Sequence, residues 1–203
     1  MAGEGRHSRR RRRETASPNG RPALYLCAVD PQTTKPRPAL FLDRDGVLNE
    51  DPGYVHLWED FVWIPGAKAA IAAFNRAGWW VFVVTNQSGV GRGYYTEDHV
   101  LELHAKMAED LALTGARIDA FYYCPHHPEA DVERYRHPDP PGRKPNPGML
   151  LQAMAEWPVD TARSIMVGDK DADVEAARRA GVRGLKFSGG NLAEFLKDEA
   201  VPA

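Results

Sequence analysis

The stretch A-L-F-L-D-R-D-G-V-L-N at residues 39–49 constrains the fold more than any other part of the chain. Its four leading apolar residues predict a short strand buried on both faces, as the inner strands of parallel sheets are. Asp43 and Asp45 follow at once, and side chains two apart in an extended chain point to the same side. Because open α/β sheets place ligands just past the carboxyl ends of their strands, both carboxylates are expected in one pocket. Gly46 behind them permits a sharp turn.

Two carboxylates this close cannot both stay charged in an apolar setting without a cation or strong donors between them. A divalent metal would satisfy them, and one acid could then act as nucleophile while the other moves a proton. Asp-x-Asp-Gly also begins calcium loops, but Val47 and Asn49 stand at the next ligand positions and no Glu closes such a loop. The alternative to a catalytic pair is a solvated turn.

Apolar runs and amphipathic stretches alternate along the rest of the chain, which predicts a parallel sheet with right-handed crossovers. The expected fold class is α/β, a Rossmann-like three-layer sandwich with a central parallel sheet. Gaps of about sixteen residues after Asn49 and about twenty-two before Asn146 are too short for a large cap domain. The expected strands are 39–42, 79–84, 118–123, 164–167 and 184–187; the expected helices are 66–77, 96–113, one begun by Asn146 and Pro147, one reaching Ala180, and a last one capped by Asn191.

The composition suits one domain with an appended leader. Hydrophobic residues make up 43% of the 203 positions, enough for a core, and the net charge of -2 argues against a dedicated nucleic-acid binder. Six Arg and two Glu in residues 1–20 give that tail +4, which leaves -6 on the remainder. Residues 1–38 are therefore expected to form a disordered or loosely attached basic leader, and residues 39–203 the folded domain.

The same counts bear on the compartment. The two cysteines, Cys27 and Cys124, are too few for a disulfide framework, so a reducing cytoplasm is expected. No apolar run approaches the length of a membrane span. Residues 23–29 could imitate a signal core, but no small-residue cleavage site follows them, so export is not expected. They could instead add a strand.

Polar side chains follow three further predicted strands or loops at the same edge of the sheet. Residues 85–88, T-N-Q-S, offer hydroxyl, amide and backbone donors for an anion such as phosphate. Lys144 lies in a proline-stiffened loop, where it could balance an acid pair and a phosphate together. Asp169 is the expected oxygen ligand for a hard cation such as magnesium, with Asp171 and Asp173 in supporting roles.

The motifs DRDGVLN, TNQSG, RKP and GDKDAD, in this order at strand ends, resemble those of haloacid dehalogenase (HAD) superfamily phosphatases. The match covers about residues 39–187. The finer patterns DPGYVH at 51–56, YYCPHHP at 122–128 and RKPNPGML at 143–150 resemble the D-glycero-D-manno-heptose 1,7-bisphosphate 7-phosphatases, and histidinol-phosphate phosphatases share much of this pattern.

This resemblance implies roles for individual residues. Asp43 would attack phosphorus, and Asp45 would protonate the leaving oxygen and then activate water. Thr85 and Lys144 would steady the phosphoryl group, and Arg143 would recognise the substrate. Asp43, the carbonyl of Asp45 and Asp169 would hold Mg²⁺ with Lys170 beside them, and the residues expected to line the substrate site are Asp51, Pro52, Gly53, Tyr54, Thr85, Asn86, Gln87 and Ser88.

One departure from the family pattern concerns a structural zinc site. Cys124 and His126 match the first half of that site, but Pro140 and Gly142 stand where its closing cysteines would be. Two ligands cannot make the closed tetrahedral site that zinc prefers. His127, His137 or Asp139 could substitute, but a metal-free, proline-stiffened loop is the expectation. Because this loop is expected near the substrate, its change also bears on whether the substrate is a heptose.

The sequence thus predicts a magnesium-dependent phosphatase for a small phosphorylated metabolite, with a sugar bisphosphate as the expected substrate and histidinol phosphate as the alternative. The protein is expected to be a cytoplasmic monomer without a membrane partner. Two other classes stay open. The arginine leader could serve a nucleic-acid-associated protein or a 3′-end phosphatase, and the residue 124–142 loop could make a zinc-organised interaction module.

Overall fold

The computed structural model describes residues 35–200. Within this range five parallel strands form one sheet, in the order β3-β2-β1-β4-β5. The chain fills one half of the sheet with its first three strands and then crosses to the other side of β1, so the switch point lies between β1 and β4. Open α/β sheets bind their ligands at such a point. The strands are β1 (Ala39–Leu42), β2 (Trp80–Asn86), β3 (Ala120–Cys124), β4 (Ile165–Gly168) and β5 (Arg183–Lys186).

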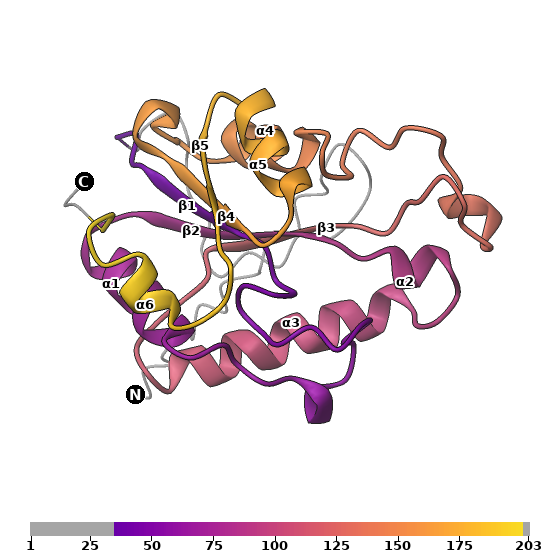
Figure 1. Ribbon diagram of the computed structural model, residues 1–203, viewed down its shortest axis with the longest axis horizontal. Helices are drawn as coiled ribbons and strands as arrows, with labels where there is room; N and C mark the ends of the chain where they lie inside the picture. The colour runs from indigo at the N-terminus through magenta and orange to yellow at the C-terminus, as the bar shows by residue number, and fades with distance from the viewer. Residues whose placement is uncertain (1–34, 201–203) are drawn as a thin grey trace, which may run out of the picture.

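Helices cover both faces of the sheet, as Figure 1 shows. On one face lie α1 (Ala67–Arg76), α3 (Glu97–Ala112) and α6 (Leu192–Phe195), and on the other lie α4 (Gly148–Glu156) and α5 (Asp171–Arg179). The central strand shows why: Leu40 and Leu42 pack toward the first group, while Phe41 packs toward the second. A strand buried on both faces needs the unbroken apolar run that β1 has.

Two helix starts bring polar groups to the carboxyl edge of the sheet. Thr96 caps α3, where its side chain accepts a hydrogen bond from the backbone N–H of His99. Lys170 is the N-cap residue of α5, and its backbone N–H donates to Asp173 Oδ2 at 2.9 Å. The second arrangement fixes Asp173 beyond the end of β4, where its carboxylate lies near that of Asp43.

The structure corrects some local predictions. Asn146 does not cap α4; Pro147 occupies the N-cap position without a side-chain bond, and the Asn146 amide donates to Asp139 Oδ1 at 2.6 Å instead. The short helix α2 (Ser88–Gly91), which begins at the last of the four residues expected to bind an anion, was not predicted. Short 3-10 helices, also not predicted, are η1 (Trp58–Asp60), η2 (Glu133–Tyr135) and η3 (Thr161–Arg163).

Two residues just before β1 already contact other segments of the chain. Arg37 pairs with Val159 in an isolated bridge, and the Pro38 carbonyl accepts a hydrogen bond from the Trp80 N–H at 3.0 Å. The possible strand at residues 23–29 lies outside the described residues. No helix within residues 35–200 has the length and apolar character that crossing a membrane requires.

Candidate active site

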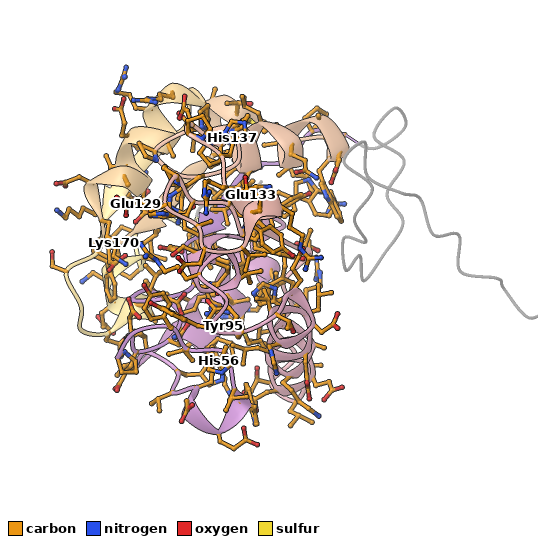
Figure 2. The ribbon with its side chains drawn as sticks, turned by 90° about the vertical axis from the view of Figure 1, so that its right-hand side faces the viewer. His56, Tyr95, Glu129, Glu133, His137 and Lys170 are labelled. Atoms are coloured by element: carbon orange, nitrogen blue, oxygen red, sulfur yellow. The ribbon has the colours of Figure 1, made fainter. Side chains whose placement is uncertain are left out.

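A cavity of about 360 Å³ opens at the carboxyl ends of β1, β2 and β4. Figure 2 views the molecule from the end where α2 and the loop after β3 lie, with Lys170 to one side and Tyr95 and His56 below. Segments far apart in sequence therefore meet here. The cavity is lined by Asp43, Asp45, Asp51, Gly53, Tyr54, Thr85, Asn86, Ser88, Tyr95, Arg143, Lys144, Lys170, Ala172 and Asp173.

A buried ion-pair triad forms the floor of the cavity. Lys144 Nζ lies 2.9 Å from Asp43 Oδ1 and 2.7 Å from Asp173 Oδ1, and all three residues are buried. Burial raises the pKa of Asp43 to about 6, although the Lys144 ammonium opposes the rise. Burial also lowers the pKa of Lys144, but Asp43 and Asp173 outweigh it and hold that pKa above its usual value. The lysine therefore stays charged at neutral pH and keeps Asp43 available as a carboxylate.

The carboxylates beside this triad fit a magnesium ion. Ligand oxygens of Asp43, Asp169 and Asp173 all lie within 4.8 Å of one another. Asp169 Oδ1 is buried and has no hydrogen-bond partner among residues 35–200, and burial raises the pKa of this carboxyl. Gly46, at φ +84°, leaves room for Asp169, since a Cβ there would come within 2.6 Å of Asp169 Oδ2. Oxygen-only ligands with an unsatisfied charge are what a hard divalent cation requires.

Lys170 borders this acidic group on its outer side. Its Nζ lies 3.7 Å from Asp169 Oδ2 and 3.5 Å from Asp51 Oδ2. The side chain is about half exposed, so these contacts are weak and adjustable. Lys170 therefore bridges the expected metal ligand and the loop at residues 51–54.

The Asp45 carboxylate is held by donors from its own turn. Arg44 is fully buried, and its guanidinium reaches Asp45 Oδ1 at 2.9 Å and Oδ2 at 3.0 Å. Asn49 Nδ2 donates to Asp45 Oδ1 at 3.1 Å. Arg44 also donates to the Val55 carbonyl at 2.6 Å, which ties the turn after β1 to the following loop. The second aspartate is thus fixed beside the first.

Asn86 joins the end of β2 to the loop that carries Lys144. Its Nδ2 donates to the Lys144 carbonyl, and the Lys144 N–H donates to Asn86 Oδ1, both at 3.0 Å. This paired contact fixes the backbone of Lys144, while Asp43 and Asp173 fix its ammonium group. Thr85, one residue earlier in β2, is buried and is one of the residues that line the cavity.

Aromatic and basic side chains form the cavity mouth. Tyr54 adopts a positive φ of 56°, uncommon for a residue with a side chain, and its ring meets that of Tyr94 edge to face at 4.8 Å. Arg143 lines the cavity next to Lys144, and burial lowers the pKa of its guanidinium. The cavity lining thus offers the Arg143 cation and the Tyr54 ring to the part of a substrate outside the phosphoryl site.

Most of the predicted site residues converge on this cavity. Pro52 and Gln87 are not among its lining residues: Gln87 is buried beneath Asp45 and Thr85. Asp169 lies next to the cavity through its contact with Lys170. Sequence reasoning missed Tyr95, which lines the cavity, and Arg44, which holds Asp45. Both residues could have been suspected from their positions, because Arg44 lies between Asp43 and Asp45 and Tyr95 lies shortly after residues 85–88.

The residues considered as zinc ligands lie at the end of β3 and in the loop that follows it. Pro140 and Gly142 have no ligand atom in their side chains. His127 Nδ1 and His137 Nδ1 accept backbone N–H groups of Glu129 and Asp139, at 3.0 and 3.1 Å. Over the described part of the chain, the converging group of three or more possible ligands is Asp43, Asp169 and Asp173. The loop's own backbone engages Nδ1 of both histidines, and within the described residues these histidines do not join Cys124 in a converging group of three ligands.

The parallel sheet without a large cap, the paired aspartates after β1 and the Lys144–Asp173 contact define the class as a HAD-like phosphatase. A HAD-hydrolase-like family model matches residues 142–199. A D-glycero-beta-D-manno-heptose-1,7-bisphosphate 7-phosphatase from Rhodopseudomonas palustris is 49% identical over 169 residues, 81% of this chain and 91% of its own length. The chain belongs to the D-glycero-D-manno-heptose-1,7-bisphosphate 7-phosphatase family.

Further relatives agree on the family but differ in the sugar anomer. The Burkholderia mallei protein, named for the alpha anomer, is 47% identical over 144 residues, 71% of this chain and 76% of its own. The crystal structure of D,D-heptose 1,7-bisphosphate phosphatase from B. bronchiseptica contains magnesium and phosphate. It superimposes with a TM-score of 0.67 at 34% identity, covering 81% of this chain and 88% of that one.

Proposed function

We propose that this protein hydrolyses the 7-phosphate of D-glycero-D-manno-heptose 1,7-bisphosphate. One observation carries the proposal: Asp43, Lys144 and Asp169, which lie on separate loops, converge at the switch point of the sheet in a chain 49% identical to an enzyme with that name. A surface turn would not hold two aspartates and a lysine in a buried triad.

In the proposed reaction, Asp43 is the nucleophile. A carboxylate oxygen of Asp43 forms a bond to phosphorus, and the bond from phosphorus to the sugar oxygen breaks, which gives an aspartyl-phosphate. Lys144 and the Thr85 hydroxyl donate to the phosphoryl oxygens, where negative charge grows during transfer. Lys144 already contacts Asp43, so attacking group and charge-stabilising group are positioned together.

Asp45 is the proposed general acid and base. It gives a proton to the departing sugar oxygen, and it later takes a proton from the water that attacks the aspartyl-phosphate. Hydrolysis returns the Asp43 carboxylate and releases inorganic phosphate. Arg44 and Asn49 hold Asp45 beside Asp43, which suits this double use of one side chain.

The ligands proposed for Mg²⁺ are Asp43, the backbone carbonyl of Asp45 and Asp169, with Lys170 next to them. When bound, the ion supplies Lewis-acid charge stabilisation to the phosphoryl group. Asp173 is proposed to keep Lys144 in place, because it contacts the ammonium and is fixed by the start of α5.

The mouth of the cavity is proposed to select the substrate. Arg143 would contact the second phosphate, and the loop at residues 51–54 with Asn86 and Ser88 would line the sugar site. A short cavity rim without a large cap suits a small sugar bisphosphate. The protein is proposed to act as a cytoplasmic monomer, since all the residues named for the chemistry come from one chain.

Parallel phosphate-release assays test this function. The alpha and beta anomers of the 1,7-bisphosphate, a heptose 7-phosphate and histidinol phosphate are compared with the wild type and with Arg143→Ala. We expect the bisphosphate to be preferred, and Arg143→Ala to cost about 10- to 100-fold in kcat/KM with it, because a charge-assisted bond to phosphate is lost.

The matched substrate is the heptose 7-phosphate, which lacks the second phosphate, so Arg143→Ala should affect it much less. An equal loss with both substrates would remove Arg143 from recognition of the second phosphate. A wild-type preference for histidinol phosphate would overturn the proposed function.

A further inference from the structure

Gln87 contacts both the residue proposed as acid and base and the residue proposed to hold the phosphoryl group. It directly follows β2 and is 1% exposed. Its Nε2 donates to Asp45 Oδ2 at 2.9 Å and to Thr85 Oγ1 at 2.8 Å. One amide nitrogen thus joins two neighbouring side chains of the cavity from beneath.

The orientation of this amide is determined at its other end. Gln87 Oε1 accepts a hydrogen bond from the Tyr95 hydroxyl at 2.7 Å and one from Arg44 Nη2 at 3.3 Å. A guanidinium has donors and no acceptor, so it must face the amide oxygen and not the NH₂ group. The NH₂ group therefore faces Asp45 and Thr85, and both of its hydrogens are used there.

This orientation has a consequence for Thr85. A hydroxyl has one proton to donate and oxygen lone pairs to accept with. Because Thr85 Oγ1 accepts from Gln87, its own proton is directed to another acceptor, and Thr85 lines the cavity. A phosphoryl oxygen in the cavity is such an acceptor. Gln87 therefore prepares the Thr85 hydroxyl as a donor before substrate arrives.

We propose that Gln87 is a positioning residue for phosphoryl transfer, which orients the Thr85 hydroxyl and the Asp45 carboxylate together and is itself oriented by Tyr95 and Arg44. The inference rests on the proposed function, since it assumes that transfer takes place at Asp43. The sequence predicted that Gln87 contacts the substrate, whereas in this proposal Gln87 lies beneath the site and acts through Thr85 and Asp45. Tyr95 acts in the same way, one contact further from the phosphoryl group.

Gln87→Met tests the proposal because methionine has a similar size and shape but cannot donate. We expect kcat to fall about 10- to 100-fold, as misplacement of catalytic groups does, with KM changed less than about threefold. A change confined to packing would instead lower the thermal unfolding midpoint and leave kcat per folded molecule unchanged.

A double-mutant cycle with Tyr95→Phe tests the connection between the two residues. Tyr95→Phe alone should lower kcat by about 3- to 10-fold, and it should change kcat by less than about twofold in the Gln87→Met background, because its effect passes through the amide. The matched control is Tyr122→Phe, which removes a buried hydroxyl bonded to Glu156 at 2.9 Å, away from the cavity. Its kcat should equal that of the wild type.

Each variant is assayed with p-nitrophenyl phosphate as well as with the heptose bisphosphate. A wild type that cleaves only the simple ester refutes the proposed substrate, while the role of Gln87 is still tested on that ester. A wild-type kcat in folded Gln87→Met, or an equal effect of Tyr95→Phe in both backgrounds, overturns the proposal. If Gln87→Met does not fold, Tyr95→Phe decides alone, and a kcat equal to that of the Tyr122→Phe control overturns it.

Discussion

Lys144 is the residue on which the charge balance of the site depends. Its side chain is 1% exposed, and it separates two buried carboxylates, Asp43 and Asp173. A buried charge without a partner is strongly destabilising, whereas a fully paired one is tolerated. The same residue therefore stabilises the fold and, in the proposed reaction, the phosphoryl group, so its removal should affect both.

Lys144→Met should abolish measurable turnover and lower the free energy of unfolding by about 3–5 kcal/mol in the absence of Mg²⁺. With the ammonium gone, the pKa of Asp43 should rise above its present value of about 6, because burial and Asp173 both raise it. Urea titrations with and without Mg²⁺ measure the loss, and added Mg²⁺ should restore more stability to the variant than to the wild type.

The control is Lys106→Met on the outer side of α3, where the lysine is half exposed and pairs with Glu109 at 3.2 Å. That pair should be worth less than about 1 kcal/mol. A similar loss in both variants would show that the triad contributes no more than a surface pair.

His104 gives a second prediction at the scale of one residue. It is fully buried in α3 and stacked on Phe121 at 4.5 Å, and neither ring nitrogen has a hydrogen-bond partner in the described structure. Burial, and next the charge of Arg44, hold the pKa of its imidazole well below 6.5. In the unfolded chain the ring takes up a proton near pH 6.5, while the folded protein excludes it.

Because the folded-state pKa is the lower one, the stability contributed by neutral His104 is present above about pH 6.5 and is lost as pH falls below it. The loss should reach about 1.4 kcal/mol per pH unit. His104→Leu should remove this slope and be more stable than the wild type at pH 5.5. Urea unfolding between pH 5 and 8 measures it, and parallel pH profiles for both proteins would contradict the prediction.

At the scale of elements, the strands were easier to predict than their ends. The apolar runs of β1, β2 and β4 are buried on both faces, so composition alone indicates them. The short helix α2 has no apolar periodicity that would predict it. The residues that follow it hold it, since Arg92 and Tyr94 donate backbone hydrogen bonds to the Ser88 and Gly89 carbonyls. Asn146 was a plausible cap by residue type, but its amide bonds Asp139 on a loop no local pattern predicts.

The loop after β3 is held by hydrogen bonds and packing within the chain. Glu97, in the first turn of α3, accepts hydrogen bonds from the Tyr123 hydroxyl at 2.6 Å and the Tyr135 hydroxyl at 2.5 Å. Tyr135 also packs in a small core with Val90 and Ala130. The Glu97 carboxylate thus joins β3, the loop after it and α3. The same loop continues to Arg143.

Tyr135→Phe should therefore lower the free energy of unfolding by about 1–2 kcal/mol and raise KM for the bisphosphate through Arg143. Purified protein should carry far less than one zinc per chain, and a zinc chelator should not change its unfolding midpoint. Tyr122→Phe, which also removes a tyrosine–carboxylate bond, should lower stability with KM unchanged. Stoichiometric zinc, or an unchanged KM in Tyr135→Phe, would contradict this account of the loop.

At the scale of the whole molecule, the sequence predicted that polar residues from separate strand ends meet in one place, because chain alternation puts those ends at one edge of the sheet. It did not predict that Gln87 and Arg44 would lie beneath that edge, because burial of a polar side chain depends on contacts across the sheet. Nor does the alternation determine the strand order β3-β2-β1-β4-β5. Local patterns identify the parts of the site, and tertiary packing decides which of them face the substrate.

The basic leader gives the last prediction. All residues proposed for the chemistry lie between Asp43 and Asp173, and residues 1–34 lie outside the described part of the chain. Residues 1–20 carry +4, which could attract polyanions to an otherwise acidic protein. A chain that begins at Lys35 should keep kcat and KM within about twofold and the unfolding midpoint within about 2 °C of the full-length protein, because it keeps Arg37 and Pro38 in their contacts with Val159 and Trp80.

Filter binding to a short single-stranded oligonucleotide separates the leader from the enzyme. Full-length protein should bind weakly at low salt and lose the oligonucleotide at physiological salt, as expected for a few unstructured charge contacts. The shortened chain should not bind at either salt concentration. Tight binding by the full chain at physiological salt, together with slower turnover after truncation, would mean that the leader and the active site serve one nucleic-acid substrate, and the sugar bisphosphate assignment would then fail with it.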